Sequence, residues 1–215
     1  MKRLFMQTSL AIGVALIVSA AAGCAGKSEL RYLDFQTKQP AALSADMEPV
    51  TIVIEPFEDR RADKARIGTR THLWGGVTHF DVVGGRPADM ISQVLVNRLK
   101  TRGWGNRAWN VRLGQAESAT DADIVIGGQV QDFSVGVKSR AFSSVIDAKS
   151  RFTIQSKNAD DQSTITRSIE GVRTRTVFWF GEQDVQELLA ATLEDGIDRL
   201  IADTMIERKA LRPVR

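Results

Sequence analysis

The side chain with the clearest chemistry in this 215-residue sequence is its single cysteine, Cys24. Lys2 and Arg3 give the chain a positive start, and residues 10–22 are almost entirely apolar. This run is shorter than the roughly 20 residues that cross a bilayer as a helix, and the arrangement is typical of a cleavable export signal. An unpaired thiol is a hazard in an oxidising compartment, so we interpret Cys24 as a cysteine that is consumed by modification.

The residues before this cysteine, Ala21-Ala22-Gly23, resemble the lipobox of bacterial lipoproteins, although Ala21 replaces the usual leucine. The resemblance implies that the Cys24 thiol is thioether-linked to diacylglycerol and becomes the new N-terminus, with palmitate-type chains as a stable membrane anchor. By the sorting rule of Gram-negative lipoproteins, Ala25 in place of Asp favours the periplasmic face of the outer membrane. An ordinary signal peptide with a coincidental cysteine is the alternative.

Other candidates for chemistry are few. His72 and His79 are the only histidines, and their separation of seven residues fits none of the compact metal-ligand spacings. Asp121 and Asp123 share a face at a strand entry, where turn chemistry is the simpler interpretation. The sequence has no Gly-x-Ser-x-Gly elbow and no phosphate-binding glycine pattern. We therefore expect no enzymatic activity, no cofactor and no metal.

Composition limits the class of partner. Removal of the signal peptide, residues 1–23, leaves 192 residues and lowers the formal net charge from +3 to +1, because Lys2 and Arg3 are lost. A chain of this length forms one domain of ordinary size. Lysine and arginine alternate with aspartate and glutamate throughout, whereas a nucleic-acid binder concentrates its basic residues. We expect a membrane partner through the anchor, an envelope protein partner, and no nucleic acid.

Three segments follow the signal peptide. Residues 24–48 hold the lipidated cysteine and a tether without sustained periodicity, in which apolar residues near 32–35 are able to dock. Residues 49–206 are expected to form a single periplasmic domain. Residues 207–215 form a basic tail that we expect to be frayed.

The domain is predicted to be α+β, a two-layer sandwich of mostly antiparallel sheet with two helices on one face, in the order β-α-β-β-β-α.

Local features of the elements are also predicted. The alternation of apolar and polar residues along the strand at 123–140 changes phase near Asp132, which predicts a β-bulge. Phe142 is expected on the core face of its strand, and Gly196 on the apolar stripe of the last helix indicates close contact with the sheet. The predicted elements are a strand at 50–57, a loop at 58–86, a helix at 87–103, strands at 123–140, 141–157 and 163–180, and a helix at 182–206.

The predicted loop combines two kinds of residue. Its first part, 58–66, has mixed charge and is interpreted as solvated. Its second part has large apolar residues that either fold over the core or form a partner-binding patch. These candidate residues are Leu73, Trp74, Val77, Phe80 and Val82. In the run 177–180, alternate residues are expected in the core, and the others are able to extend such a patch.

Three features together resemble the YajG family of outer-membrane lipoproteins. They are the Val-Thr-Ile-Val-Ile strand before Asp59-Arg60, the helix that ends at Gly103 before an aromatic residue, and the last helix from Ala191 to Thr204. The resemblance implies an outer-membrane lipoprotein and transfers no catalytic residues. The layout also resembles secretion lipoproteins of the CsgG type and auxiliary lipoproteins of lipid-transport systems. We expect a non-enzymatic envelope accessory or binding module, with a role in lipid transport or secretion as the alternative.

Overall fold

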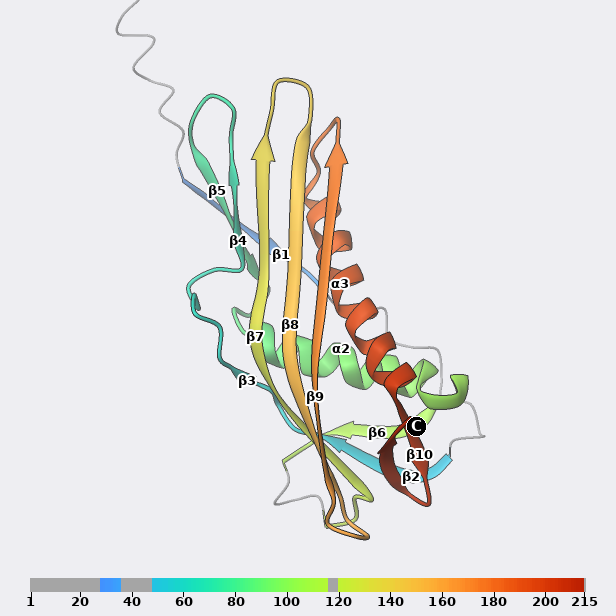
Figure 1. The fold of residues 1–215 in the computed structure, drawn as a ribbon. Coiled ribbons are helices and arrows are strands. Elements are labelled where there is room, and N and C mark those ends of the chain that lie inside the picture. Colours follow the sequence, from blue (N-terminus) through green and yellow to red (C-terminus); the bar gives the residue numbers. More distant parts are fainter. Residues whose placement is uncertain (1–27, 36–47, 116–119, 215) are drawn as a thin grey trace, which may run out of the picture.

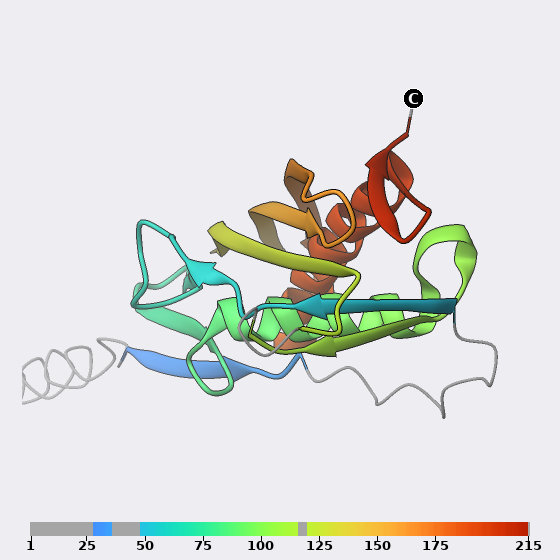
Figure 2. The same ribbon diagram turned by 90° about the horizontal axis from the view of Figure 1, so that it is seen from below.

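The computed structural model describes residues 28–35, 48–115 and 120–214, which form a curled mixed sheet and two long helices that share one core (Figure 1). Figure 2 shows the sheet curled partway around helix α2. None of the described helices is both long and apolar enough to cross a membrane. The strands are β1 (Glu29–Leu33), β2 (Glu48–Ile54), β3 (Glu58–Asp59), β4 (Gly68–Thr71), β5 (Val77–Val82), β6 (Trp109–Leu113), β7 (Ile124–Ser139), β8 (Ser144–Asn158), β9 (Thr164–Val177), β10 (Thr204–Glu207) and β11 (Ala210–Pro213). The helices are α2 (Pro87–Arg102), the short η2 (Trp104–Asn106) and α3 (Glu182–Asp203).

The α+β class is confirmed, but the expectation of a mostly antiparallel sheet is wrong. Five strand pairings in the large sheet are parallel, and three are antiparallel. The long strands β7, β8 and β9 are antiparallel neighbours, as predicted. The short strands β2, β3 and β4 lie one after another along the other edge of β7 and run parallel to it. Alternation along one strand carries no information on the direction of its neighbour, so the sequence did not reveal this arrangement.

Several local predictions are confirmed. Helix α2 begins at Pro87, where a missing N–H is tolerated, and ends before Gly103. The pairing of β7 with β8 shifts register between Val130 and Asp132, so Gln131 is the extra residue of a β-bulge. Helix α3 begins at Glu182, as predicted, and the N–H of the preceding Gly181 donates to the Asp184 carboxylate at 2.9 Å. These features depend on neighbouring residues and are therefore visible in the sequence.

Both ends of the domain and the predicted loop contain more regular structure than expected. Residues 58–86 include β3 and the β4–β5 hairpin. Strand β1 lies within the segment expected to be a tether and pairs with β5, with Leu33 buried. Residues 204–213 form the β10–β11 hairpin in place of the last helical turn and a frayed tail. The element order therefore contains more strands than the predicted β-α-β-β-β-α. The sequence did not indicate these additional strands, because they form only by pairing with other strands of the fold.

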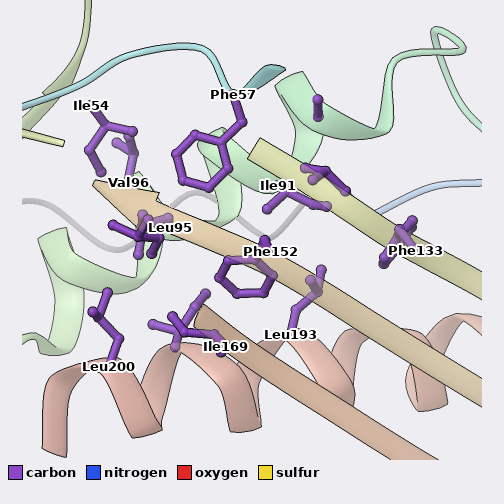
Figure 3. Packing of buried hydrophobic residues seen from close by; sticks show 14 of the residues in the cluster. Ile54, Phe57, Ile91, Leu95, Val96, Phe133, Phe152, Ile169, Leu193 and Leu200 are labelled. Carbon is purple, nitrogen blue, oxygen red and sulfur yellow. The ribbon is translucent and has the colours of Figure 1, made fainter. Parts of the chain in front are cut away.

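One hydrophobic core joins both helices to the sheet (Figure 3). Leu95 of α2 and Leu193 of α3 reach the core from opposite sides of Phe152, which is 1% exposed. The close contact predicted for Gly196 is confirmed, since a Cβ there would lie 2.7 Å from Ile169 Cγ2 and 3.2 Å from Phe152 Cζ. The glycine therefore lets α3 approach the side chains of the sheet closely.

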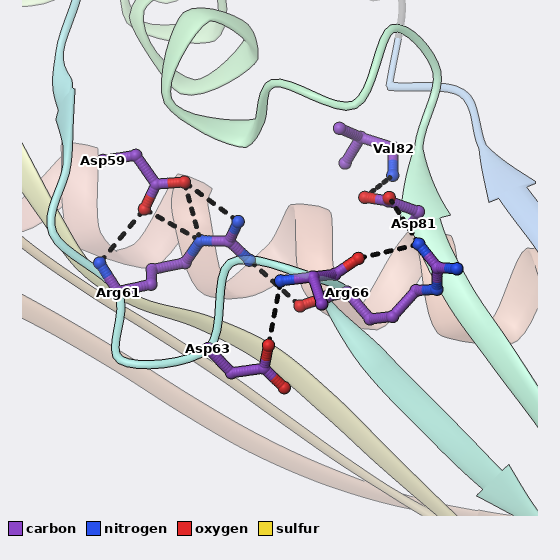
Figure 4. Close-up of polar contacts among 7 residues, drawn as sticks. Asp59, Arg61, Asp63, Arg66, Asp81 and Val82 are labelled. Carbon is purple, nitrogen blue, oxygen red and sulfur yellow. Dashed lines mark hydrogen bonds and ion pairs between the residues drawn. The ribbon is translucent and has the colours of Figure 1, made fainter.

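The mixed-charge segment 58–66 is organised by a buried arginine (Figure 4). The Arg61 guanidinium donates to Asp59 through Nε at 3.1 Å and Nη2 at 3.0 Å, and Nη1 donates to the Arg66 carbonyl at 3.2 Å. Burial alone would raise the Asp59 pKa, but hydrogen bonds and charge from Arg61 lower it overall. The segment is thus anchored by an ion pair rather than fully solvated, and it leads the chain into the β4–β5 hairpin.

The C-terminal hairpin is attached to the sheet through Asn158, which is fully buried. Its Nδ2 donates to the Leu211 carbonyl at 3.1 Å, and its Oδ1 accepts from the Leu211 N–H at 2.8 Å. We expect Asn158→Ala to cost about 2 kcal/mol, because both backbone groups of Leu211 lose their partner in a buried place. Urea unfolding and hydrogen exchange at the Leu211 amide measure the effect.

The matched control for this prediction is Asn110→Ala. The Asn110 side chain is exposed and makes a single 3.3 Å hydrogen bond to Thr51 Oγ1. Its loss should change the free energy of unfolding by less than about 0.5 kcal/mol. Equal effects of the two substitutions would show that Asn158 does not hold the hairpin.

Candidate functional site

Three connections that are far apart in the sequence meet at one end of the molecule. They are residues 72–76 between β4 and β5, residues 140–143 between β7 and β8, and residues 178–181 between β9 and α3. Strand pairing brings them together: Thr71 pairs with Lys138, Ser139 with Ser144, and Ser144 with Val177. Figure 1 shows the ends of these strands side by side at the top of the view.

Large aromatic side chains project from all three connections. Trp74 is 92% exposed, Phe142 86%, Phe178 83% and Trp179 91%. We call these four residues the aromatic tip. Scattered single apolar residues are normal on a protein surface, whereas four aromatic residues gathered at one end mark an interaction site. The aromatic tip is therefore the candidate functional site.

A groove with a volume of about 620 Å³ lies among these connections. Arg70 is one of the residues that line it, and its guanidinium carbon lies 3.8 Å from the centre of the Phe180 ring while its Nε donates to Ser139 Oγ at 3.0 Å. Burial of Arg70 lowers the pKa of its guanidinium below the ordinary value. Of the described residues that line the groove, Arg70 and Arg140 are basic and none is acidic. The site thus combines exposed aromatic rings with positive charge.

The structure separates the apolar residues that the sequence grouped together. Leu73 and Trp74 are exposed at the turn, and Val77 is partly buried. Phe80 and Val82, in contrast, are buried on β5 and belong to the core. Phe80 and Val82 therefore follow the alternative in which these residues pack in the core. Leu73 and Trp74 form an exposed surface, and a partner-binding role for that surface stays a prediction. Cys24 lies outside the described residues.

Two aromatic stretches were only partly assigned from the sequence. Phe142 was expected on the core face of a strand, but it lies in the turn before β8 and is exposed, because the strand begins only at Ser144. In the run 177–180, Phe178 and Trp179 are both exposed, while Phe180 is partly buried against Arg70 and Phe80. The sequence signal for an exposed aromatic residue was the pair of adjacent aromatic residues at the end of this strand. Side chains alternate between the two faces of a regular strand, so only one of two neighbours can face the core.

Three of the four candidate residues for acid-base or metal chemistry make polar contacts, whereas the Nδ1 atom of the fourth, His79, is buried without a hydrogen-bond partner. His72 Nε2 lies 2.8 Å from Thr78 Oγ1. Asp123 accepts from the Thr51 N–H at 2.9 Å, and Asp121 pairs with Arg112. Among the residues that the structure describes, no group of three or more His, Cys, Asp or Glu side chains is placed to hold a metal ion.

No family model matches the chain, and no curated protein matches it significantly. Similar solved structures include a Xanthomonas campestris protein of the DUF330 family model, at 11% identity, covering 81% of this chain and 92% of that chain with a TM-score of 0.46. The lipoprotein GNA1162 from Neisseria meningitidis is 10% identical, with coverages of 68% and 96% and a TM-score of 0.34. The PelC dodecamer from Paraburkholderia phytofirmans is 15% identical, with coverages of 73% and 94% and a TM-score of 0.37. At these TM-scores, none of the likenesses assigns a role to this chain.

Proposed function

We propose that this chain is a lipoprotein held by Cys24 on the periplasmic face of the outer membrane, where it acts as a non-enzymatic envelope accessory or binding module. The observation that carries the proposal is the export signal that ends in Ala21-Ala22-Gly23-Cys24, with no second cysteine in the chain. Acylation explains why one unpaired thiol is present in an exported protein. The resemblance to the YajG family belongs to the same proposal.

The aromatic tip supports the binding part of the proposal. Its four side chains are rigid and large, and each leaves apolar surface in water that contact with a partner would remove. The sequence-based expectation of an envelope protein partner stays a proposal as well. Hydrolysis of a generic ester or of peptidoglycan that is lost on His72→Ala or His79→Ala would instead favour an enzyme.

A role in an envelope lipid-transport or secretion system is the second candidate. The groove of about 620 Å³ beside exposed aromatic rings favours it, because a lipid carrier needs an apolar recess. A membrane pore has weaker support, since the outward positions of the long strands are mainly polar, among them Lys149, Arg151 and Glu170.

Metabolic labelling of cells with palmitate tests the anchor. The full-length protein should incorporate the label, and Cys24→Ser should lose all of it, because the thioether needs the thiol. The matched variant Ala25→Asp should remain labelled but move from the outer to the inner membrane on a density gradient. Label on Cys24→Ser, or an unlabelled wild-type protein, would contradict lipidation at Cys24.

A further inference from the structure

We propose that the aromatic tip docks onto the same membrane that holds the lipid of Cys24, with its tryptophan and phenylalanine side chains among the headgroups of an anionic phospholipid bilayer. The inference deepens the proposed function and rests on it for the anchor. It is carried by three independent features: where the chain enters the fold, which side chains project there, and which charges accompany them.

The chain enters the fold at the end that carries the aromatic tip. Glu29, the first residue of β1, pairs with Thr78 of β5, and Thr78 is four residues from Trp74. At about 3.3 Å per residue, the backbone of Trp74 lies within roughly 13 Å of this entry point. An ion pair of 3.2 Å between Arg31 and Glu182 also joins β1 to the start of α3, next to the aromatic tip.

The short link to the anchor restricts the orientation of the domain. Five residue steps separate Cys24 from Glu29, which span at most about 18 Å when fully extended. Strand β7 has 16 residues and is therefore roughly 50 Å long, with Ser139 at the aromatic tip and Ile124 at the far end. With the far end on the bilayer and the strands upright, Glu29 would stand about 40 Å above the surface, beyond the reach of this link. With the aromatic tip on the bilayer, the link is long enough.

The side chains at this end suit the interface of a bilayer. Trp and Phe side chains project from three separate turns, and Trp is enriched where membrane proteins meet the headgroup region. A helix does not need to insert, because exposed rings on turns enter the interface without leaving strand backbone groups unpaired. The aromatic tip thus has the shape of a shallow membrane contact.

The charge of the groove lining points to anionic headgroups, and the nearby acidic residues Glu29 and Glu182 are ion-paired with Arg31. Arg70 and Arg140 line the groove without an acidic lining residue, and Arg140 is exposed. Each arginine near an anionic surface strengthens binding about fivefold. A second copy of the chain or a partner protein would need its own acidic and apolar patch to match the aromatic tip. An anionic bilayer supplies both negative charge and apolar surface, and the anchor already holds the aromatic tip close to it.

Tryptophan fluorescence tests the docking directly. The chain has four tryptophans, and Trp104 and Trp109 are buried, while Trp74 and Trp179 belong to the aromatic tip. The mature protein, purified from membranes, is reconstituted in vesicles of phosphatidylglycerol and phosphatidylcholine with brominated acyl chains, which quench only tryptophans at the bilayer. We expect quenching of the wild type and none in the control Trp74→Phe/Trp179→Phe, which keeps the rings but leaves only the buried tryptophans.

Two further variants test the contributions of charge and aromatic rings. Arg140→Gln should weaken docking about fivefold on anionic vesicles and leave it unchanged on purely phosphatidylcholine vesicles. Phe142→Ser/Phe178→Ser should weaken it at least about tenfold, since two aromatic rings no longer enter the interface. Far-ultraviolet circular dichroism shows that each variant remains folded.

Palmitate labelling of the same preparations separates this inference from the proposed function. Quenching of a labelled protein supports both, and quenching of an unlabelled protein supports docking while it overturns anchoring at Cys24. An unquenched, labelled protein overturns docking and leaves the anchor intact. Photo-crosslinking from position 74 in cells that yields only protein adducts, with none to lipid, also overturns docking.

Discussion

Replacement of Gly171 by alanine is expected to destabilise the protein by about 3 kcal/mol, because the new methyl group would collide with a helix backbone. Gly171 is buried on β9, and a Cβ there would lie 2.3 Å from the carbonyl oxygen of Thr192 in α3. The strand is held by its full-length pairing with β8, and α3 is held by the core, so neither can shift without loss of contacts.

Thermal unfolding of the variant measures this effect, with an expected decrease in Tm of about 6–12 °C. Gly136→Ala is the matched control, because Gly136 is exposed on β7 and its Cβ would meet nothing within 4 Å. It should change stability by less than about 0.5 kcal/mol. Adding Thr192→Ala to Gly171→Ala should restore nothing, since the obstacle is a backbone atom. A stable Gly171→Ala variant would mean that α3 lies further from the sheet.

Phe152→Ala is expected to cost about 4 kcal/mol, because it opens a cavity at the centre of the only large core among the described residues. The ring of Phe152 lies 6.4 Å from that of Phe57, between the two helices and the sheet. Residues from β2, α2 and α3 surround it, so no single element can close the cavity. Urea unfolding should show a lower midpoint at an unchanged m-value.

Phe142→Ala is the matched control for Phe152, since the same residue type lies ten positions earlier but is exposed. Its effect on the free energy of unfolding should stay below about 0.5 kcal/mol. The comparison separates the two uses of phenylalanine in this fold, because Phe152 stabilises the core and Phe142 belongs to the aromatic tip. Similar losses from both substitutions would show that Phe142 is packed in solution and would weaken the case for a membrane contact.

Gly196 and Gly171, on facing elements, show which close contacts can be predicted from the sequence and which cannot. Gly196 interrupts the apolar stripe of α3, so its close contact with the sheet was predictable from one helix alone. Gly171 lies on a strand whose neighbour across the core is not visible in the sequence, and its role depends on the path of α3. The constraint on Gly196 follows from the pattern of its own helix, whereas the constraint on Gly171 exists only after α3 has packed on the sheet.

The sequence by itself determined the features that depend on neighbouring residues. These are the start of α2 at Pro87 and its end before Gly103, the three long strands and the bulge near Asp132. The export signal with Cys24 was likewise read from residue order alone and stays a proposal. Each arises from residue order, backbone restriction or periodicity within one element, so no knowledge of the partner is needed.

Only the tertiary structure decided which strands pair in parallel, that β1 and β10–β11 join the domain, and where the aromatic residues lie. Trp74 and Phe80 are six residues apart, yet one is exposed at a turn and the other is buried on β5. Strand pairing aligns the ends of β4, β7, β8 and β9 at one end of the molecule. The connections that carry Trp74, Phe142 and Trp179 therefore lie close together. Pairing between distant strands is a property of the whole fold, since its free energy comes from contacts that no single segment contains.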